Sequence, residues 1–209
     1  MAKKLIITIA RQYGSGGREI GERVGALLGI PVYDKELITH AADKGEMHED
    51  IAKKVDEVAA NSLLYTLAMG SNTFGSAMAF GYKMPINDKL FLYQSDAIRD
   101  FAARGSCIII GRCADYVLRE EPNMLRIFIH SDLDHRKARV AERHPDVKPV
   151  QVIDIINKTD KRRSSYYNFY TGNKWGKYDN YDMMINSSTI GIDRAVEMIA
   201  TVARDLMQD

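Results

Sequence analysis

The sequence predicts an α/β protein built around a mainly parallel β-sheet. Its first elements are an apolar run at residues 4–10, a glycine-rich turn and a helical pattern, which is the order strand, loop, helix. Further apolar runs then alternate with helical patterns along the rest of the 209 residues. Strands that alternate with helices favour a parallel sheet with right-handed crossover connections. No repeat, low-complexity tract or linker divides the chain, so we expect a single domain over residues 1–209.

The first strand and helix have the clearest signals. The run KLIITIA at residues 4–10 is rich in β-branched residues and does not alternate with polar ones, which predicts a strand buried on both faces. From Arg18 onward, apolar residues recur at helical spacing, and Gly29 is a suitable C-terminal stop for that helix.

The remaining elements follow the same two patterns. Short apolar runs predict strands at residues 31–33, 106–111, 124–130 and 181–186. Apolar residues three and four positions apart predict helices at residues 35–44, 50–60, 89–103, 134–143, 150–167 and 192–207. Residues 114–119 are expected to form a short helix or a turn.

The charge balance argues against a nucleic-acid partner. Lys and Arg total 29 against 28 Asp and Glu, which leaves a net charge of +1, whereas duplex-binding proteins usually carry a basic surplus. The basic residues are nevertheless concentrated at residues 126–163. A basic patch in a neutral protein suits a small anionic ligand better than a long polyanion.

The cysteines and the N-terminus indicate a cytoplasmic protein. Cys107 and Cys113 lie within or just after a predicted buried strand, so we expect reduced core thiols rather than a disulfide or a metal site. The apolar stretch near the N-terminus spans only about six residues, too short for a signal peptide. No run reaches transmembrane length, so we expect no membrane partner.

The glycine-rich turn at residues 10–19 is the first candidate site. It reads ARQYGSGGRE and joins the first strand to the first helix, where backbone N–H groups and the helix dipole can hold a phosphate. The Walker A pattern is G-x-x-x-x-G-K-[ST]. Here Arg11 stands at the first glycine, Gly16 keeps the second, Gly17 stands in place of the lysine and Arg18 in place of the hydroxyl residue. Either Arg11 or Arg18 could replace the missing cation, although guanidinium is a planar fork rather than a point charge.

Two other interpretations of this turn are weaker. It could simply connect the strand to the helix without binding a ligand. It could also belong to a dinucleotide-binding fold, but the acidic residue that such folds carry about 20 residues after their glycines is only loosely matched by Asp34.

The downstream arginines form the second candidate site. Arg112 directly follows a predicted strand, at the sheet edge where ligands bind in open α/β folds, and Asp115 could orient it. Two predicted helices carry further charged residues, which suggest a lid over the phosphates: Arg136, Arg139 and Arg143 on one, then Asp160, Arg162 and Arg163 on the other. A solvated charged face is the alternative for any one of them. The tyrosines near Trp175 could stack on a base or merely pack.

Residues 62–88 lack a sustained period and combine Gly, Ser, Met and aromatic residues. This segment could cover an acceptor, pack against a second subunit in a homodimer, or form irregular core packing.

The chain resembles the cytidylate kinase-like family, a branch of the nucleoside monophosphate kinases within the P-loop fold. Matching segments run from about residue 4 to 207, and the most specific are ARQYGSGG, IIIGRCADYVL and DKRRSSYY. The resemblance implies a P-loop kinase fold with a five-stranded parallel sheet flanked by helices. It also implies an acceptor-binding insertion at about residues 46–90, a lid at about residues 136–165, and ATP and Mg²⁺ as cofactors.

The same resemblance suggests residue roles, together with the charge patterns above. For catalysis we expect Arg18, Arg112, Asp160 and Arg163. For the ATP phosphates we expect Arg11, Tyr13, Gly14, Ser15, Gly16, Gly17, Arg18, Glu19, Arg139 and Arg143. For the acceptor we expect Asp34, Lys35, Arg112, Asp115 and Arg163. No metal ligand is assigned.

Two departures from the family pattern leave the acceptor open. The loop lacks the lysine of true cytidylate kinases, and YDKELI after the second strand lacks their nucleotide-gripping pattern. CMP or dCMP is the first acceptor hypothesis. A kinase for another small acceptor, and a nucleotide-binding regulatory protein without transfer activity, are the alternatives.

Overall fold

The computed structural model describes residues 3–34, 39 and 85–208. Five parallel strands form one sheet in the order β2-β3-β1-β4-β5. They are β1 (Ile6–Arg11), β2 (Val32–Tyr33), β3 (Cys107–Ile110), β4 (Met124–His130) and β5 (Met183–Asn186). The α/β class and the five-stranded parallel sheet are therefore confirmed.

Seven α-helices and one 3₁₀ helix accompany the sheet in the described residues. They are α1 (Gly17–Leu28), α6 (Ile86–Ala103), α7 (Ala114–Val117), α8 (Leu133–Arg143), α9 (Pro149–Thr171), α10 (Ser187–Ile190), α11 (Ile192–Gln208) and η1 (Tyr178–Asn180). The helices predicted at residues 35–44 and 50–60, Lys35 and nearly all of the 46–90 insertion lie outside the described residues.

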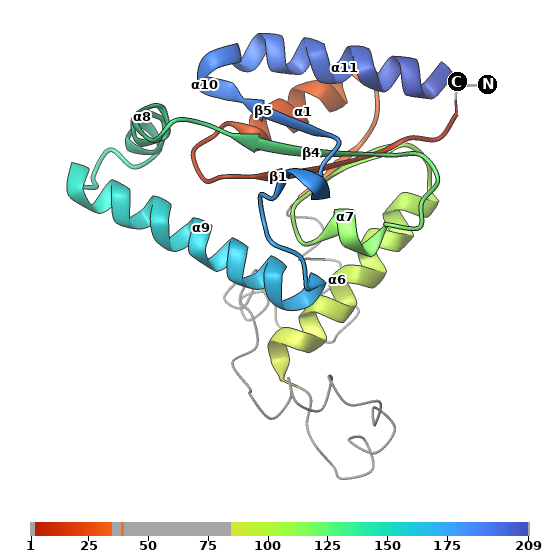
Figure 1. Ribbon diagram of the computed structural model, residues 1–209, viewed down its shortest axis with the longest axis horizontal. Coiled ribbons are helices and arrows are strands. Elements are labelled where there is room, and N and C mark those ends of the chain that lie inside the picture. Colours follow the sequence, from red (N-terminus) through yellow and green to blue (C-terminus); the bar gives the residue numbers. More distant parts are fainter. Residues whose placement is uncertain (1–2, 35–38, 40–84, 209) are drawn as a thin grey trace.

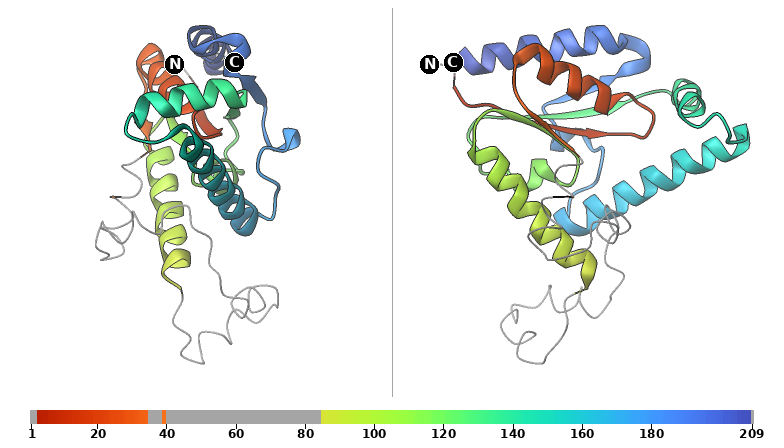
Figure 2. Two further views of the ribbon diagram at one scale, coloured as in Figure 1. Left: turned by 90° about the vertical axis from the view of Figure 1, so that its left-hand side faces the viewer. Right: turned by 180° about the vertical axis from the view of Figure 1, so that it is seen from behind.

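The helices cover both faces of the sheet (Figures 1 and 2). Ile7 and Ile9 of β1 pack with Ile20 of α1 and Ile199 of α11 in one core cluster. Ile6, the alternate residue, belongs to a second cluster with residues of α6 and α7. Both faces of β1 are thus buried, as its unbroken apolar run predicts.

The strands run from the end that carries the two chain termini toward α8 (Figure 1). The backbone N–H of Lys3 donates to the carbonyl of Met207 at 2.8 Å, which ties the terminal segments together. The opposite edge collects the carboxyl ends of all five strands, with the glycine loop, α8 and α9 beside it. In open α/β sheets this is the edge where ligands bind.

The cysteine interpretation is confirmed. Cys107 and Cys113 are both buried and free. Burial raises the pKa of the Cys107 thiol to about 11, so this thiol is protonated at neutral pH. None of the described helices is long and apolar enough to span a membrane.

Some element boundaries differ from the expected ones. Helix α9 continues to Thr171 and ends where Gly172 takes a left-handed conformation, with φ of 71°. Strand β5 starts two residues later than expected, because the 3₁₀ helix η1 precedes it. The short helix α10 was not predicted; Asn186 caps it by accepting a hydrogen bond from the backbone N–H of Ser188.

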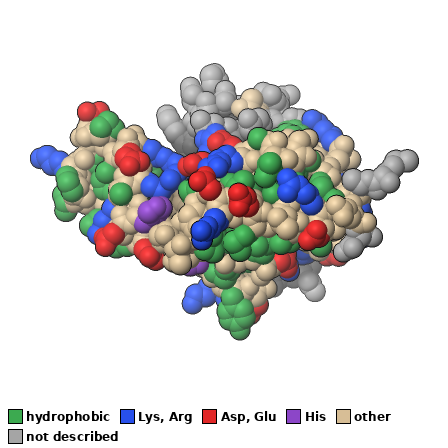
Figure 3. Space-filling model, turned by 90° about the horizontal axis from the view of Figure 1, so that it is seen from above, with side chains coloured by type: hydrophobic (Ala, Val, Ile, Leu, Met, Phe, Trp, Pro, Cys, Tyr) green, Lys and Arg blue, Asp and Glu red, His purple; other side chains and the backbone are tan. Residues whose placement is uncertain are grey.

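Figure 3 shows the molecule from above, on the side of α11. Acidic and basic side chains are mixed across this face, in keeping with the net charge of +1.

Candidate active site

The glycine loop folds tightly between β1 and α1. Gly14 and Gly16 take left-handed conformations, with φ of 80° and 82°. Ser15 points inward: its hydroxyl lies within hydrogen-bonding distance of the carbonyls of Gln12 (2.9 Å) and Ile129 (3.1 Å). The Ser187 hydroxyl donates to the Ser15 carbonyl at 2.7 Å. Ser15 was predicted as part of the ATP-binding loop, and its hydroxyl is used inside the fold.

The two arginine-bearing helices α8 and α9 hold the loop through the backbone of Tyr13. The Tyr13 N–H donates to Asp160 of α9 at 2.7 Å, and its carbonyl accepts from Arg136 of α8 at 2.8 Å. Arg136 also donates to the second oxygen of Asp160. Asp160 thus binds the backbone of the loop and pairs with Arg136, and its predicted catalytic role stays a prediction. Arg136 was predicted as a lid residue on the charged face of its helix; its contact with the backbone of the loop was not predicted.

The side chain of Tyr13 makes further contacts with the same two helices. Its hydroxyl lies 3.1 Å from Nε2 of His144, the residue that follows α8. The guanidinium of Arg163 lies 5.7 Å from the centre of the Tyr13 ring, and Arg163 also donates to the carbonyl of Arg11 at 3.2 Å. Arg163 is thereby placed beside the loop, as predicted for a group that acts on bound phosphates.

A cavity of about 190 Å³ opens in front of the loop. Four arginines contribute to its wall, together with loop residues and one carboxylate: Arg11, Gln12, Tyr13, Gly14, Gly16, Gly17, Arg18, Asp34, Arg143 and Arg163. Helix α1 begins at Gly17, so the positive end of its dipole faces this cavity. The positive charge, the glycine backbone in the cavity wall and the helix N-terminus together favour a phosphate-bearing ligand.

Arg139 and Glu19 pair beside this cavity rather than lining it. Arg139 donates to Glu19 at 2.5 Å, and a Cβ on Gly16 would lie 3.6 Å from its guanidinium carbon. The Nε of Arg139 is buried and has no hydrogen-bond partner among the described residues. An unused donor next to the loop is a further feature that suits an anionic ligand.

Asp34 connects the loop to the end of β3. Its carboxylate accepts from Arg112 at 2.8 Å and lies 3.5 Å from Arg18 and 3.9 Å from Arg11. Burial alone would raise the pKa of Asp34, but the three guanidinium groups outweigh it and hold the pKa below its usual range. Arg112 has φ of 51° and is buried. It is oriented by Asp34, not by Asp115 as expected.

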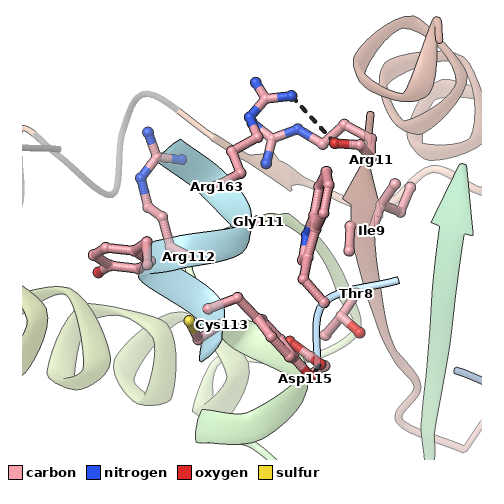
Figure 4. Close-up of a pocket in the computed structure, with 12 residues that line it drawn as sticks. Thr8, Ile9, Arg11, Gly111, Arg112, Cys113, Asp115 and Arg163 are labelled. Carbon is pink, nitrogen blue, oxygen red and sulfur yellow. Dashed lines mark hydrogen bonds between the residues drawn. The ribbon is translucent and has the colours of Figure 1, made fainter. Parts of the chain in front are cut away.

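A second, smaller pocket of about 20 Å³ adjoins the ends of β1 and β3 (Figure 4). Arg11, Arg112 and Arg163 lie toward one end of it in the view, and Thr8 and Asp115 toward the other. The Tyr167 hydroxyl donates to Asp115 at 2.7 Å, and burial raises the pKa of Asp115. The Thr8 hydroxyl is buried without a partner among the described residues, so a polar group placed there would gain a hydrogen bond.

The structure brings most of the predicted residues together. Those predicted for ATP line the larger cavity, except Ser15, Glu19 and Arg139, and Arg112, Asp115 and Arg163 line the smaller one. Lys35 lies outside the described residues. Gln12 and Thr8 were not proposed; Gln12 accepts from the Ser131 N–H at 3.2 Å and lines the larger cavity. Its position within the loop was the available signal. The roles of all these residues remain predictions.

The Tyr13 anchor predicts a stability effect. Replacing Asp160 with Asn removes the charge from the pair with the buried Arg136 and leaves part of its hydrogen bonding unmet. We expect the free energy of unfolding to fall by about 1–3 kcal/mol, measured by urea titration. Asp134→Asn is the matched control, because Asp134 is 93% exposed and pairs with Lys137 one turn away on α8. Equal losses in the two variants would contradict the anchoring role of Asp160.

Comparisons with known proteins fit this architecture. The model of the family described as "Cytidylate kinase-like family" matches residues 6–189. An uncharacterized protein from Eubacterium ventriosum ATCC 27560 is 28% identical, with a TM-score of 0.70, covering 96% of this chain and 98% of that one. No curated protein matches the chain.

Two solved kinases share the fold at lower identity. A shikimate kinase from Bacteroides thetaiotaomicron is 11% identical with a TM-score of 0.54, covering 96% of this chain and 98% of that one. A gluconokinase from Sinorhizobium meliloti 1021 is 12% identical with a TM-score of 0.51, covering 99% and 97%. These likenesses confirm the P-loop kinase fold.

Proposed function

Since the chain belongs to the cytidylate kinase-like family, we propose that it transfers the γ-phosphoryl group of ATP to a small acceptor. The acceptor proposed first is a nucleoside monophosphate, CMP or dCMP. The observation that carries this proposal is the pairing of the two cavities. Arg11 and Arg163 line both of them, so two ligands bound there would meet between these arginines.

The larger cavity suits the phosphates of ATP. The start of α1 and the glycine backbone provide N–H groups, and Arg11, Arg18 and Arg143 provide positive charge. Phosphoryl transfer depends mainly on alignment and on neutralising the charge of the transferred group. Arg163, which stands at the junction of the two cavities, is placed for that second role.

Among the described residues, those around the loop do not fit a protein-held Mg²⁺ in the usual position. Arg18 stands where a hydroxyl residue would bind the metal. Among the described residues that line the larger cavity, Asp34 is the carboxylate, and it is already surrounded by guanidinium groups. No cluster of three or more acidic, histidine or cysteine residues occurs in the described part of the chain. In the proposed reaction Mg²⁺ enters as the counter-ion of ATP.

For a nucleoside monophosphate, Arg112 is the proposed ligand of the acceptor phosphate. That phosphate would compete with or displace Asp34, which accepts from Arg112 at 2.8 Å. An acceptor phosphate oxygen is already negatively charged, so the reaction needs no strong general base.

The same ion pair favours a second candidate, a kinase for a hydroxyl-bearing acceptor. In this case Asp34 neutralises the charge of Arg112, so that the acceptor needs no anionic group to pair with Arg112. A carboxylate near the acceptor could take the proton that a hydroxyl loses on transfer. Asp34 is the proposed group: its arginines hold it ionised, and it contacts Arg112, which lines the smaller cavity, although Asp34 itself lines the larger one.

The test is ADP release from Mg²⁺-ATP across a panel of acceptors. We expect release that depends on CMP or dCMP and exceeds that with UMP, AMP or GMP, because the choice of a cytidine nucleotide follows from the family to which the chain belongs. Release with shikimate, gluconate or another polyhydroxy acid, and with no nucleotide, would instead establish the second candidate. ATP binding without ADP release for any acceptor would contradict both and favour a regulatory protein.

A further inference from the structure

Two residues of the glycine loop have exchanged their chemical types relative to the Walker A pattern. The pattern has a small glycine at its first position and a long cation at its seventh. In this chain the first position is Arg11 and the seventh is Gly17. The proposed phosphate site therefore lacks the lysine at position 17, but it has a cation, Arg11, six residues earlier in the chain.

The structure shows that these two changes depend on each other. A Cβ added to Gly17 would lie 2.6 Å from Cβ of Arg11 and 3.2 Å from its Cγ. These are the first carbons of the Arg11 side chain, next to the backbone, so they cannot swing away as a flexible end would. A side chain at position 17 and the arginine at position 11 therefore exclude each other.

Gly17 is needed for space and not for its backbone conformation. It is the first residue of α1 and does not have a positive φ, unlike Gly14 and Gly16. Any residue could adopt its helical backbone. The contact with Arg11 is thus the steric reason for a glycine at this position.

Arg11 is also placed where the missing lysine would act. It is the last residue of β1, and its side chain is 11% exposed. It lines both cavities, whereas Arg18 lines only the larger one. Arg18 is 45% exposed and donates to Glu22 on its own helix at 2.8 Å, which directs it toward the surface.

We infer that Arg11 takes over the phosphate contact of the Walker lysine, entering from the strand end, and that Gly17 is the space that admits it. The inference rests on the proposed binding of ATP at the loop. A guanidinium can hold two phosphate oxygens at once, so the replacement preserves charge and adds a second hydrogen bond.

The test measures the affinity for ATP and for adenosine, which carries no phosphate, by isothermal titration calorimetry in four variants. Arg11→Gln is expected to weaken ATP binding about 10- to 100-fold, the loss typical of a charge-assisted contact, and to leave adenosine binding unchanged. Gly17→Lys is expected to lower the melting temperature and ATP affinity, because its Cβ meets Arg11. The double variant Arg11→Gly, Gly17→Lys is expected to recover both relative to Gly17→Lys, and to bind ATP more tightly than Arg11→Gly alone.

The controls separate this inference from the proposed function. Arg99→Gln removes an exposed arginine of α6 that pairs with Asp96, and should leave ATP affinity unchanged. ATP binding that is unaffected by Arg11→Gln would overturn the inference, and so would a double variant no better than either single one. If ATP binds and responds as expected but no acceptor yields ADP, the proposed function fails and the role of Arg11 stands. A wild-type protein that does not bind ATP overturns both.

Discussion

Replacing Arg163 with Ala is expected to lower the turnover of ATP about 10³- to 10⁵-fold, the range seen when a transition-state arginine is lost. Arg163 reaches both cavities from α9 and donates to the carbonyl of Arg11 at 3.2 Å. Charge on the transferred group moves during the reaction, so an arginine at the junction acts more on the transition state than on bound ATP. The affinity for ATP should therefore fall far less than turnover.

The measurement compares the turnover number with the dissociation constant of ATP in the same variant. Lys161→Ala is the control, because it removes a cation from α9 two positions away whose side chain is exposed, whereas Arg163 is half-buried. Arg163→Lys should retain only part of the activity, since an ammonium group lacks the planar fork of guanidinium. Equal losses in turnover and in ATP affinity would contradict a transition-state role and indicate simple binding.

Replacing Gly14 with Ala is expected to destabilise the fold strongly. A Cβ at this position would lie 2.9 Å from the carbonyl oxygen of Arg136 and 2.9 Å from a methyl group of Val140, both on α8. The residue also has φ of 80°. The left-handed conformation costs about 1–2 kcal/mol for a residue with a side chain, and overpacking adds about 1–3 kcal/mol. The expected loss in the free energy of unfolding is the sum of these two effects.

Gly172→Ala separates the two contributions in the same experiment. Gly172 has φ of 71°, and a Cβ there would have no atom within 4 Å. In a urea titration, the free energy of unfolding of the Gly172→Ala variant should fall only by the cost of the left-handed conformation. If Gly14→Ala lowered the free energy of unfolding no more than Gly172→Ala, this would contradict the close approach of α8 to the loop. Loss of ATP binding in Gly14→Ala should accompany the destabilisation, because the loop and α8 must separate to admit the methyl group.

The local part of this structure was predictable from the sequence. Each strand is a short apolar run, and alternation or its absence along a strand depends only on neighbouring residues. The end of α1 at Gly29 was predicted correctly, since a left-handed glycine terminates a helix through its own backbone. The glycine loop was likewise predicted, with most of the residues that line the larger cavity, because they are contiguous in the chain.

The partners of the charged residues could not be predicted from the sequence. Asp34 was weighed mainly for its distance from the glycines, yet its partner Arg112 is 78 residues away. Asp115 was expected to orient Arg112 from three residues away, but it accepts from Tyr167 instead. Asp160 was expected to be a catalytic residue of the lid, and its bond to the backbone of Tyr13, 147 residues away, was not foreseen.

These differences have one physical reason. Periodicity shows which face of a helix is polar, but not which segment that face will meet. The sheet order β2-β3-β1-β4-β5 places the ends of β2 and β3 side by side, and so pairs Asp34 with Arg112. The packing of α8 and α9 against the loop decides that Arg136 and Asp160 anchor Tyr13 while Arg163 faces the cavities. The sequence by itself determined the five strands, the longer described helices and the glycine loop, because these depend on short-range patterns. The tertiary structure decided which charge meets which, because that depends on contacts between distant parts of the chain.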